Sequence, residues 1–498
     1  MPDSAIVAGC AVIMLVLGII GIQQSLFGDE LFTFEMSTRS GLSQVIDGVR
    51  GPLEISPPLF FVLAWATGKL GDATVWLRIP SLAAAVAAVP LIYAVGCRTV
   101  GRRAGIVGAA LLAISPSMVF FATEARAYSL MMGLALASTW ALTKAVEGGE
   151  RRWWLLYAVA GAAALYAHYV AVFVLAAQAS WGLWAHPRAR RAVAAANAAM
   201  LVAFLPWVPA VLDDASSPFQ DAISRVWPLT AAYVPRALAT WVAGTPLLPP
   251  REMPGRIALA LGALGLVLLA GSAIDRWRSC GQGSPRWRPS PGLVLVAALA
   301  VATPVGALLY SLVLPSIFVP RTLLASLPAA LLAIGAVAVR ARRPWGFAAV
   351  ALLVAALAVG TAKFLTADRR PEFREAARFI EARSLPGDVI VETGLFEPGL
   401  LQAHLRRPRP VYVDTCTRVT TGPGQLLNGR AGCDAPPLTG FRVAVRAARD
   451  RRLFLVTAAP KPGNRIPPPP RIPGFRLVDR RSWDGTWRLA VREYDWIG

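Results

Sequence analysis

The sequence predicts a polytopic α-helical membrane protein with about 11 transmembrane helices and several juxtamembrane helices, followed by a small extracytoplasmic α/β domain. Hydrophobic residues make up 55% of the 498 residues and charged residues only 16%, which is typical of membrane proteins rather than soluble domains. The apolar residues are grouped in runs of about 20, enough to cross a bilayer as a helix. The chain turns polar near Thr366. We therefore expect a transmembrane domain over 1–365 and an extracytoplasmic domain over 366–498.

The apolar runs give the expected spans in chain order. The fifth and sixth are short and joined by a tight connection, which makes their common boundary the hardest to place. We expect spans near 5–26, 74–95, 104–121, 127–146, 153–167, 168–186, 191–211, 257–274, 292–311, 322–339 and 345–364.

Arginine clusters follow alternate spans and predict the orientation. Lys and Arg in short loops stay on the cytoplasmic side, so we expect a cytoplasmic N-terminus and an extracytoplasmic C-terminal domain. The net charge of +21 is then a topology signal, and with no Arg-rich tail or RNA-binding motif it does not indicate nucleic acid. The clusters are Arg98, Arg102 and Arg103; Arg151 and Arg152; Arg188, Arg190 and Arg191; Arg276, Arg278, Arg286 and Arg288; and Arg340, Arg342 and Arg343.

The apolar stretch 57–71 is only about 15 residues long, which fits an interfacial or re-entrant helix better than a span. Counting it as a span would also move the cluster at Arg98 to the outside. A short, tilted true span is the alternative.

Two adjacent carboxylates, Asp29 and Glu30, directly follow the first apolar run. A charge at a membrane boundary is costly unless it is solvated, paired or used, and two like neighbours shift each other's pKa. Such a pair facing an external cavity could deprotonate an incoming hydroxyl. The alternative is a solvated loop acid that ends a helix.

The predicted topology gathers further polar residues on the external side, from segments far apart in the chain. Each also has a structural interpretation: Ser56 before two prolines as a helix start, Glu124 with Arg126 as an interfacial ion pair, His168 with Tyr169 as a helix-end pair, and Arg321 as a snorkelling side chain. The external set is Asp29, Glu30, Ser56, Glu124, Arg126, Tyr128, His168, Tyr169, the loop from about Leu212 to Arg256, and Arg321.

The tail shows the pattern of an α/β unit. A helix is expected over 372–384, strands near 388–392, 410–414 and 452–458, and a terminal hairpin about Asp484-Gly485, which is a strong turn signal. The segment 461–474 is proline-rich and is expected to be an extended surface connection.

Five cysteines are present, and only Cys416 and Cys433 fall in the external tail. That compartment permits oxidation, so we expect a Cys416–Cys433 disulfide, with two free thiols as the alternative. With no C-x-x-C pair and three histidines, no zinc site is indicated.

These strings together resemble the integral-membrane glycosyltransferases of the C-type (GT-C) fold, specifically the family 39/83-like group of protein O-mannosyltransferases and aminoarabinose transferases. The resemblance covers about 1–345. Its carriers are FGDELF, SPPLFF, WLRIPSLAAA, GRRAGIVGAALLAISP, EARAYSL, YAHY and FVPRTLLASLP.

The resemblance implies an enzyme that takes one sugar from a polyprenyl-phosphate carrier and transfers it, with inversion, at the outer face of a bacterial inner membrane. Asp29 would be the general base, with Glu30 beside it. No further cofactor is required, and a divalent cation is left open but is not indicated. Membrane lipids and a glycan, lipid or protein acceptor are the implied partners. Relatives carry a basic residue or His before the proline pair, where this chain has Ser56. Arg126 and Arg321 are therefore our candidates for holding the lipid phosphate.

Two other classes of function remain. A transporter or flippase of lipid-linked sugars is expected to show charges within its spans and internal repeats; almost no such charge and no obvious repeat are seen here. A non-catalytic scaffold would tolerate Asn at Asp29. The sequence leaves the sugar open between arabinofuranose and mannose.

Overall fold

The computed structural model describes residues 2–51, 54–215, 217, 224–246, 250–279, 289–342, 344–367, 370–393, 399–407, 409–413, 439–460, 465–485 and 487–498. The chain divides into two compact units. The first comprises Met1–Ile22, Ile46–Ala64 and Arg78–Phe364, and the second Gln23–Val45, Trp65–Leu77 and Leu365–Gly498. The second unit thus combines the tail with two short segments from the N-terminal part of the chain.

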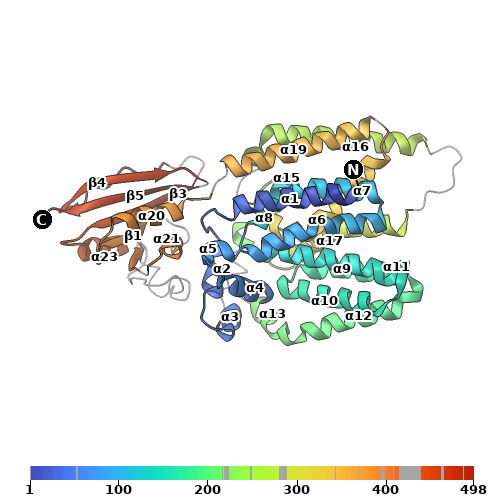
Figure 1. The fold of residues 1–498 in the computed structure, drawn as a ribbon, viewed down its shortest axis with the longest axis horizontal. Coiled ribbons are helices and arrows are strands. Elements are labelled where there is room, and N and C mark those ends of the chain that lie inside the picture. Colours follow the sequence, from blue (N-terminus) through green and yellow to red (C-terminus); the bar gives the residue numbers. More distant parts are fainter. Residues whose placement is uncertain are drawn as a thin grey trace. The chain divides into compact units, whose positions relative to one another are not determined.

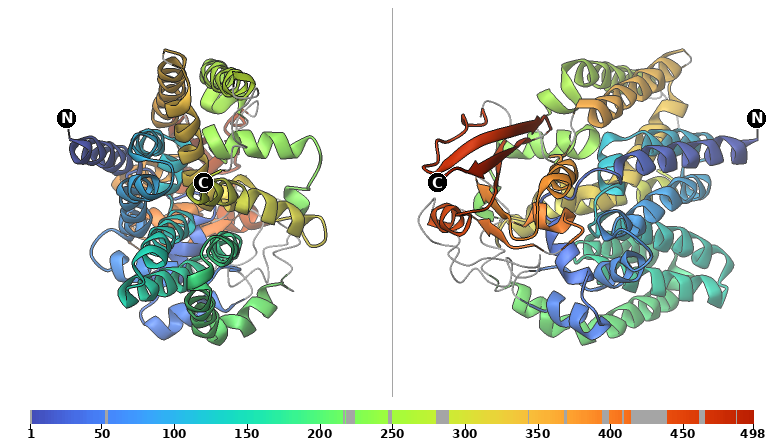
Figure 2. Two further views of the ribbon diagram at one scale, coloured as in Figure 1. Left: turned by 90° about the vertical axis from the view of Figure 1, so that its right-hand side faces the viewer. Right: turned by 60° about the vertical axis from the view of Figure 1, so that its left-hand side comes forward.

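The first unit is helical, and its long helices run side by side (Figures 1 and 2). Every predicted span coincides with a helix or a pair of helices. They are α1 (Asp3–Gly21), α6 (Ile79–Thr99), α7 (Arg102–Ala113), α8 (Pro116–Ala122), α9 (Tyr128–Gly148), α10 (Arg151–Ala167), α11 (Ala171–Ala185), α12 (Arg190–Phe204), α13 (Val208–Ala215), α16 (Arg256–Ser279), α17 (Pro291–Ser311), α18 (Leu327–Arg340) and α19 (Trp345–Ala367).

Among the described residues, 8 helices are long and apolar enough to cross a membrane, and a ninth span is obtained if α7 and α8 are one span bent by 62°. The chain is therefore a multi-pass membrane protein, as predicted. The fifth and sixth predicted spans form helices of 17 and 15 residues, so the total of 11 crossings stays a prediction. The stretch 57–71 forms α4 (Leu59–Gly68), whose 10 residues are too few to cross.

Local sequence explains the bend between α7 and α8. Pro116 occupies the first turn of α8, where its missing N–H costs nothing, and the Ser115 hydroxyl accepts a hydrogen bond from the Met118 amide at 3.4 Å. Small residues then bring neighbouring helices close: a Cβ at Gly96 would lie 2.6 Å from the Gly105 Cα. The most enclosed spans are α9 and α18, with 67% and 72% of their apolar windows buried.

The second unit contains a five-stranded sheet of order β2-β1-β3-β5-β4. The strands are β1 (Val389–Thr393), β2 (Val411–Val413), β3 (Leu453–Pro460), β4 (Phe475–Trp483) and β5 (Trp487–Trp496). The pairs β1–β2 and β1–β3 are parallel, and β5 is antiparallel to both β3 and β4. The predicted hairpin about Asp484-Gly485 is confirmed as β4–β5, and the small α/β domain as a whole is confirmed.

Helices cover both faces of this sheet. Neighbouring residues of a strand point to opposite faces, so each face has its own contacts. Tyr494 joins the apolar core beneath α23 (Thr439–Ala447), together with Val391 and Leu455. Glu493 faces the other way and pairs with Arg383 at the end of α20 (Phe373–Arg383) at 3.7 Å. The unit also contains α2 (Glu30–Ser37), α5 (Ala73–Trp76) and α21 (Leu400–His404).

The expected Cys416–Cys433 disulfide lies outside the described residues, so it stays a prediction. Of the cysteines that are described, Cys10 and Cys97 are free thiols.

Candidate functional site

Arg126 lies at the centre of a polar cluster in the first unit. It belongs to the short non-helical connection between α8 and α9, whose backbone is held by a 2.9 Å hydrogen bond from the Ser81 hydroxyl to the Arg126 carbonyl. Its guanidinium donates to both carboxylate oxygens of Glu54, at 2.7 and 3.1 Å, and lies 5.8 Å from the centre of the Phe61 ring. Arg126 is 8% and Glu54 3% exposed, so this is a buried bidentate ion pair.

Glu54 is a residue that sequence reasoning missed. It precedes the Ser56-Pro57-Pro58 segment by two positions, and its carboxylate also accepts a hydrogen bond from the Ile55 amide at 3.1 Å. The sequence signal that could have identified Glu54 is its position in a loop predicted to be external. Glu124 was the carboxylate considered as a partner for Arg126, whereas the ion pair seen here is with Glu54.

His168 and Tyr128 adjoin this ion pair. His168 ends α10 with an extended backbone, and its Nδ1 accepts a 3.3 Å hydrogen bond from the Val170 amide. Its ring centre lies 5.3 Å from that of Tyr128, the first residue of α9. Both Arg126 and Arg321 act electrostatically on His168, which places all four side chains in one neighbourhood.

Tyr169 extends the cluster toward α13. Its hydroxyl donates a 2.6 Å hydrogen bond to Asp214 Oδ2 and accepts one of 3.0 Å from the Trp207 indole. Arg50 lies over the Trp207 ring at 5.3 Å. The short distance to Asp214 is typical of a charge-assisted hydrogen bond. Asp214 and Trp207 were also missed, because a single acid and an aromatic residue at a predicted span end carry no distinctive pattern.

Arg321 lies in a short 3-10 helix, η4 (Pro320–Ser326), directly before α18. Its guanidinium carbon is 5.3 Å from the centre of the Trp227 ring, and the side chain is half-buried. Cation–π contact at such a distance is favourable. The role of Arg321 in the site stays a prediction, beside its interpretation as a snorkelling side chain.

Ser56 and Glu124 are the two remaining predicted site residues of the first unit, and their surroundings say less about a role. Ser56 is 5% exposed and lies just before α4, as the helix-start interpretation requires. Glu124 is half-buried, and its carbonyl accepts a 2.8 Å hydrogen bond from the Arg126 amide.

Asp29 and Glu30 belong to the second unit and have different surroundings. Asp29 directly precedes α2 and is half-buried. Glu30 is fully buried and forms an ion pair with Arg370, and its Oε2 accepts a 3.1 Å hydrogen bond from the Phe27 amide. Of the two carboxylates Asp29 is the more exposed, and it stays the predicted base.

Glu35 is a further buried acid on α2, and it was not considered from the sequence. It is 4% exposed, and neither carboxylate oxygen has a hydrogen-bond partner among the described residues. Burial raises the pKa of Glu35 to about 9, with the nearby charge of Arg39 acting in the opposite direction. The side chain is therefore protonated at neutral pH.

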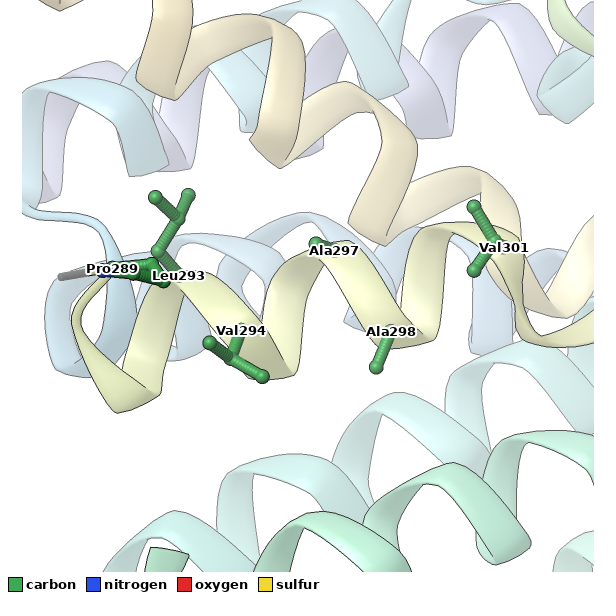
Figure 3. Close-up of a pocket in the computed structure, with 6 residues that line it drawn as sticks. All are labelled: Pro289, Leu293, Val294, Ala297, Ala298 and Val301. Carbon is green, nitrogen blue, oxygen red and sulfur yellow. The ribbon is translucent and has the colours of Figure 1, made fainter. Parts of the chain in front are cut away.

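A groove of about 510 Å³ lies along the first half of α17 and is entirely apolar. It is lined by Pro289, Leu293, Val294, Ala297, Ala298 and Val301 (Figure 3). None of these side chains can bind a phosphate or move a proton, so the groove is not the candidate site. Within the described ranges, no group of three or more His, Cys, Asp or Glu side chains is arranged to hold a metal ion.

Comparison of the sequence with protein families matches part of the chain. The family described as dolichyl-phosphate-mannose-protein mannosyltransferase matches residues 56–212. Among curated proteins no match was found.

Solved structures match over most of the chain. ArnT from Cupriavidus metallidurans bound to undecaprenyl phosphate is 14% identical, with a TM-score of 0.56 over 98% of this chain and 97% of that one; its apo form gives the same TM-score and identity over 98% of each chain. The apo oligosaccharyltransferase of Archaeoglobus fulgidus is 10% identical, with a TM-score of 0.51 over 91% of this chain and 69% of that chain. The resemblance to C-type membrane glycosyltransferases is confirmed, and the chain has their fold.

Proposed function

We propose that the protein is an inverting glycosyltransferase that moves a single sugar from a polyprenyl-phosphate carrier to a hydroxyl-bearing acceptor at the outer face of the membrane. The observation that carries this proposal is the cluster around Arg126, built from four connections of the first unit that the sequence predicts to be external. The family match over 56–212 contains most of this cluster. The fold shared with a protein that binds undecaprenyl phosphate is consistent with it.

In the proposed reaction the acceptor hydroxyl gives its proton to Asp29 as its oxygen attacks the anomeric carbon. The bond between that carbon and the phosphate oxygen breaks, and the polyprenyl phosphate leaves with the bonding electrons. A hydroxyl is a poor nucleophile unless its proton is removed during attack, and a positioned carboxylate typically contributes 10²–10⁴-fold in rate. Glu30 supports Asp29 through its buried pairing.

Arg126 and Arg321 are proposed to bind the phosphate of the carrier. Charge that develops on a leaving phosphate is stabilised by fixed cationic donors, and arginine suits phosphate because its planar guanidinium can donate two hydrogen bonds. The bidentate contact with Glu54 and the ring of Trp227 hold the two guanidinium groups in place. Tyr128, His168 and Tyr169 are proposed to contact the sugar or phosphate, with Ser56 and Glu124 at the margin.

The proposal is tested by donor consumption in membranes that contain the protein. Undecaprenyl-phosphate mannose and undecaprenyl-phosphate arabinofuranose are supplied separately, and release of undecaprenyl phosphate is followed by mass spectrometry. Asp29→Asn is expected to insert normally and lose activity by about 10²–10⁴-fold. Asp47→Asn, which changes an exposed acid on helix α3 (Leu42–Val49), is the matched control and should keep full activity.

Near-normal release by Asp29→Asn would remove Asp29 as the base. Movement of intact donor across the membrane without release of undecaprenyl phosphate would favour a transporter instead.

A further inference from the structure

The loop that joins α1 to Asp29 is held by the C-terminal tail at successive residues. The Gln24 side chain accepts a 3.2 Å hydrogen bond from the Arg370 amide, and the Ser25 hydroxyl accepts one of 3.0 Å from the Arg374 amide. The Leu26 amide donates to His404 Nε2 at 3.1 Å. The rings of Phe27 and Trp487 meet edge to face, with centroids 5.8 Å apart. All these residues belong to the second unit.

His404 is fixed in one tautomer by these contacts. Its Nδ1 lies 2.7 Å from the Leu400 carbonyl, which can only accept, so Nδ1 carries the proton and Nε2 is the acceptor for the Leu26 amide. The neutral ring thus spans α21 and the loop. This contact supports the backbone one residue before Phe27, whose own amide donates to Glu30.

Arg370 is the tail residue with the most direct connection to the acidic pair. Its backbone amide binds Gln24, and its guanidinium pairs with Glu30, which is 340 residues away in the sequence. Arg370 is 4% exposed and Glu30 fully buried. Loss of this cation would remove the buried counter-charge of Glu30, and the charge of Glu30 would then act more strongly on the adjacent Asp29.

We propose that Arg370 is a positioning residue: it holds Glu30 and the Gln24–Glu30 loop, and so fixes the orientation of Asp29 at the start of α2. The C-terminal unit then contributes to sugar transfer through this contact, without itself touching the substrate. This inference rests on the proposed role of Asp29 as general base. A displacement of about 1 Å at a reacting group can cost about 10²-fold in rate, so loss of this contact acts on turnover rather than on donor binding.

The test combines two measurements on the full-length protein in nanodiscs. Hydrogen exchange of the peptide containing 24–30 reports on the loop, through the amides of Leu26 and Phe27. Donor consumption then gives kcat and KM for whichever undecaprenyl-phosphate sugar the wild type uses. Arg370→Gln is expected to speed exchange of this peptide by about 10-fold or more and to lower kcat by about 10–100-fold, while KM changes by less than about 2-fold.

Three further variants separate positioning from general destabilisation. Arg370→Lys keeps the charge and should restore much of the protection and of kcat. The double variant Glu30→Gln with Arg370→Gln leaves no unpaired charge, so its exchange should be slower than that of Arg370→Gln alone. Arg378→Gln removes an exposed arginine of α20, the helix that follows Arg370, whose partner is Glu375 at 2.6 Å, and should behave as the wild type in both measurements.

Unchanged exchange in Arg370→Gln would overturn the inference, and so would faster exchange with unchanged kcat. Failure of the proposed function looks different. If Asp29→Asn keeps transfer while Arg370→Gln loses both loop protection and kcat, Asp29 is not the base, but the tail still positions the acidic segment. If the wild type consumes neither donor, the exchange measurement alone decides whether Arg370 holds the loop.

Discussion

Arg126 binds the carboxylate of Glu54 through two hydrogen bonds of 2.7 and 3.1 Å, although 72 residues separate them in the chain. The pair is buried, so each charge compensates the other in a place where an ion is costly. It also fixes the guanidinium plane, which is what a preorganised phosphate site requires. Glu54 therefore has a structural role that can be tested apart from catalysis.

Glu54→Gln is expected to lower the stability of the first unit by about 3–5 kcal/mol, because it removes the charge of the carboxylate that the buried guanidinium binds. Thermal unfolding in detergent measures this effect. Glu54→Gln combined with Arg126→Gln should recover part of the loss. The exposed pair Arg152–Glu150, at 2.7 Å, is the control: Glu150→Gln should cost about 1 kcal/mol or less. An unchanged unfolding midpoint in Glu54→Gln would contradict the importance of the pair.

Arg321→Gln is expected to weaken binding of undecaprenyl phosphate, because a neutral amide cannot replace a charged donor to phosphate. Hydrogen bonds to charged groups contribute about 1.5–3 kcal/mol, or roughly 10–150-fold in Kd. Native mass spectrometry with undecaprenyl phosphate alone measures this without an acceptor. Arg236→Gln changes an exposed arginine of α15 (Tyr233–Ala243) and should leave Kd unchanged; equal Kd values for both variants would remove Arg321 from the phosphate site.

Glu35→Gln is expected to stabilise the protein increasingly as pH rises. The pKa of Glu35 is raised from 4.5 to about 9 in the folded state, so between these values the folded chain holds a proton that the unfolded chain has released. The contribution of Glu35 to stability is therefore complete below pH about 4.5 and is lost as pH approaches 9. Gln is neutral throughout and removes this dependence.

Unfolding midpoints of the wild type and Glu35→Gln, measured from pH 5 to pH 9, should diverge with the variant higher at alkaline pH. Asp47→Asn, at an exposed acid, should show no such divergence. Parallel curves for the wild type and Glu35→Gln would mean that the Glu35 carboxyl is ionised in the folded protein.

The topology makes a separate prediction. Reporter fusions after Arg103 and after Gly498 should lie on opposite sides of the membrane, with Arg103 cytoplasmic, because the arginine clusters follow alternate spans. The same fusions to an Asp29→Asn chain should report the same sides. If both positions report the same side, the predicted topology is wrong, and the residues assigned to the outer face do not all lie on that face.

The sequence by itself determined the long apolar helices, the short helix α4 and the terminal hairpin. Apolar runs of spanning length, the arginine clusters between them and the Asp484-Gly485 turn are local signals, since each depends on residues close together in the chain. The short helix α4 and the hairpin β4–β5 were predictable for that reason. The motif resemblance also indicated the fold, because the motifs fall in order along one chain.

Only the tertiary structure decided which polar groups pair. Glu54 with Arg126, Asp214 with Tyr169, and Arg370 with Glu30 are separated by 72, 45 and 340 residues, and no local periodicity specifies such partners. A buried charge binds whichever counter-charge the packing of helices brings within about 3 Å, and many carboxylates in the chain would satisfy an arginine equally well. The proposed division of roles between Asp29 and Glu30 depends on Arg370, which follows the last predicted span and lies 340 residues from Glu30 in the sequence. No sequence pattern around the acidic pair extends that far.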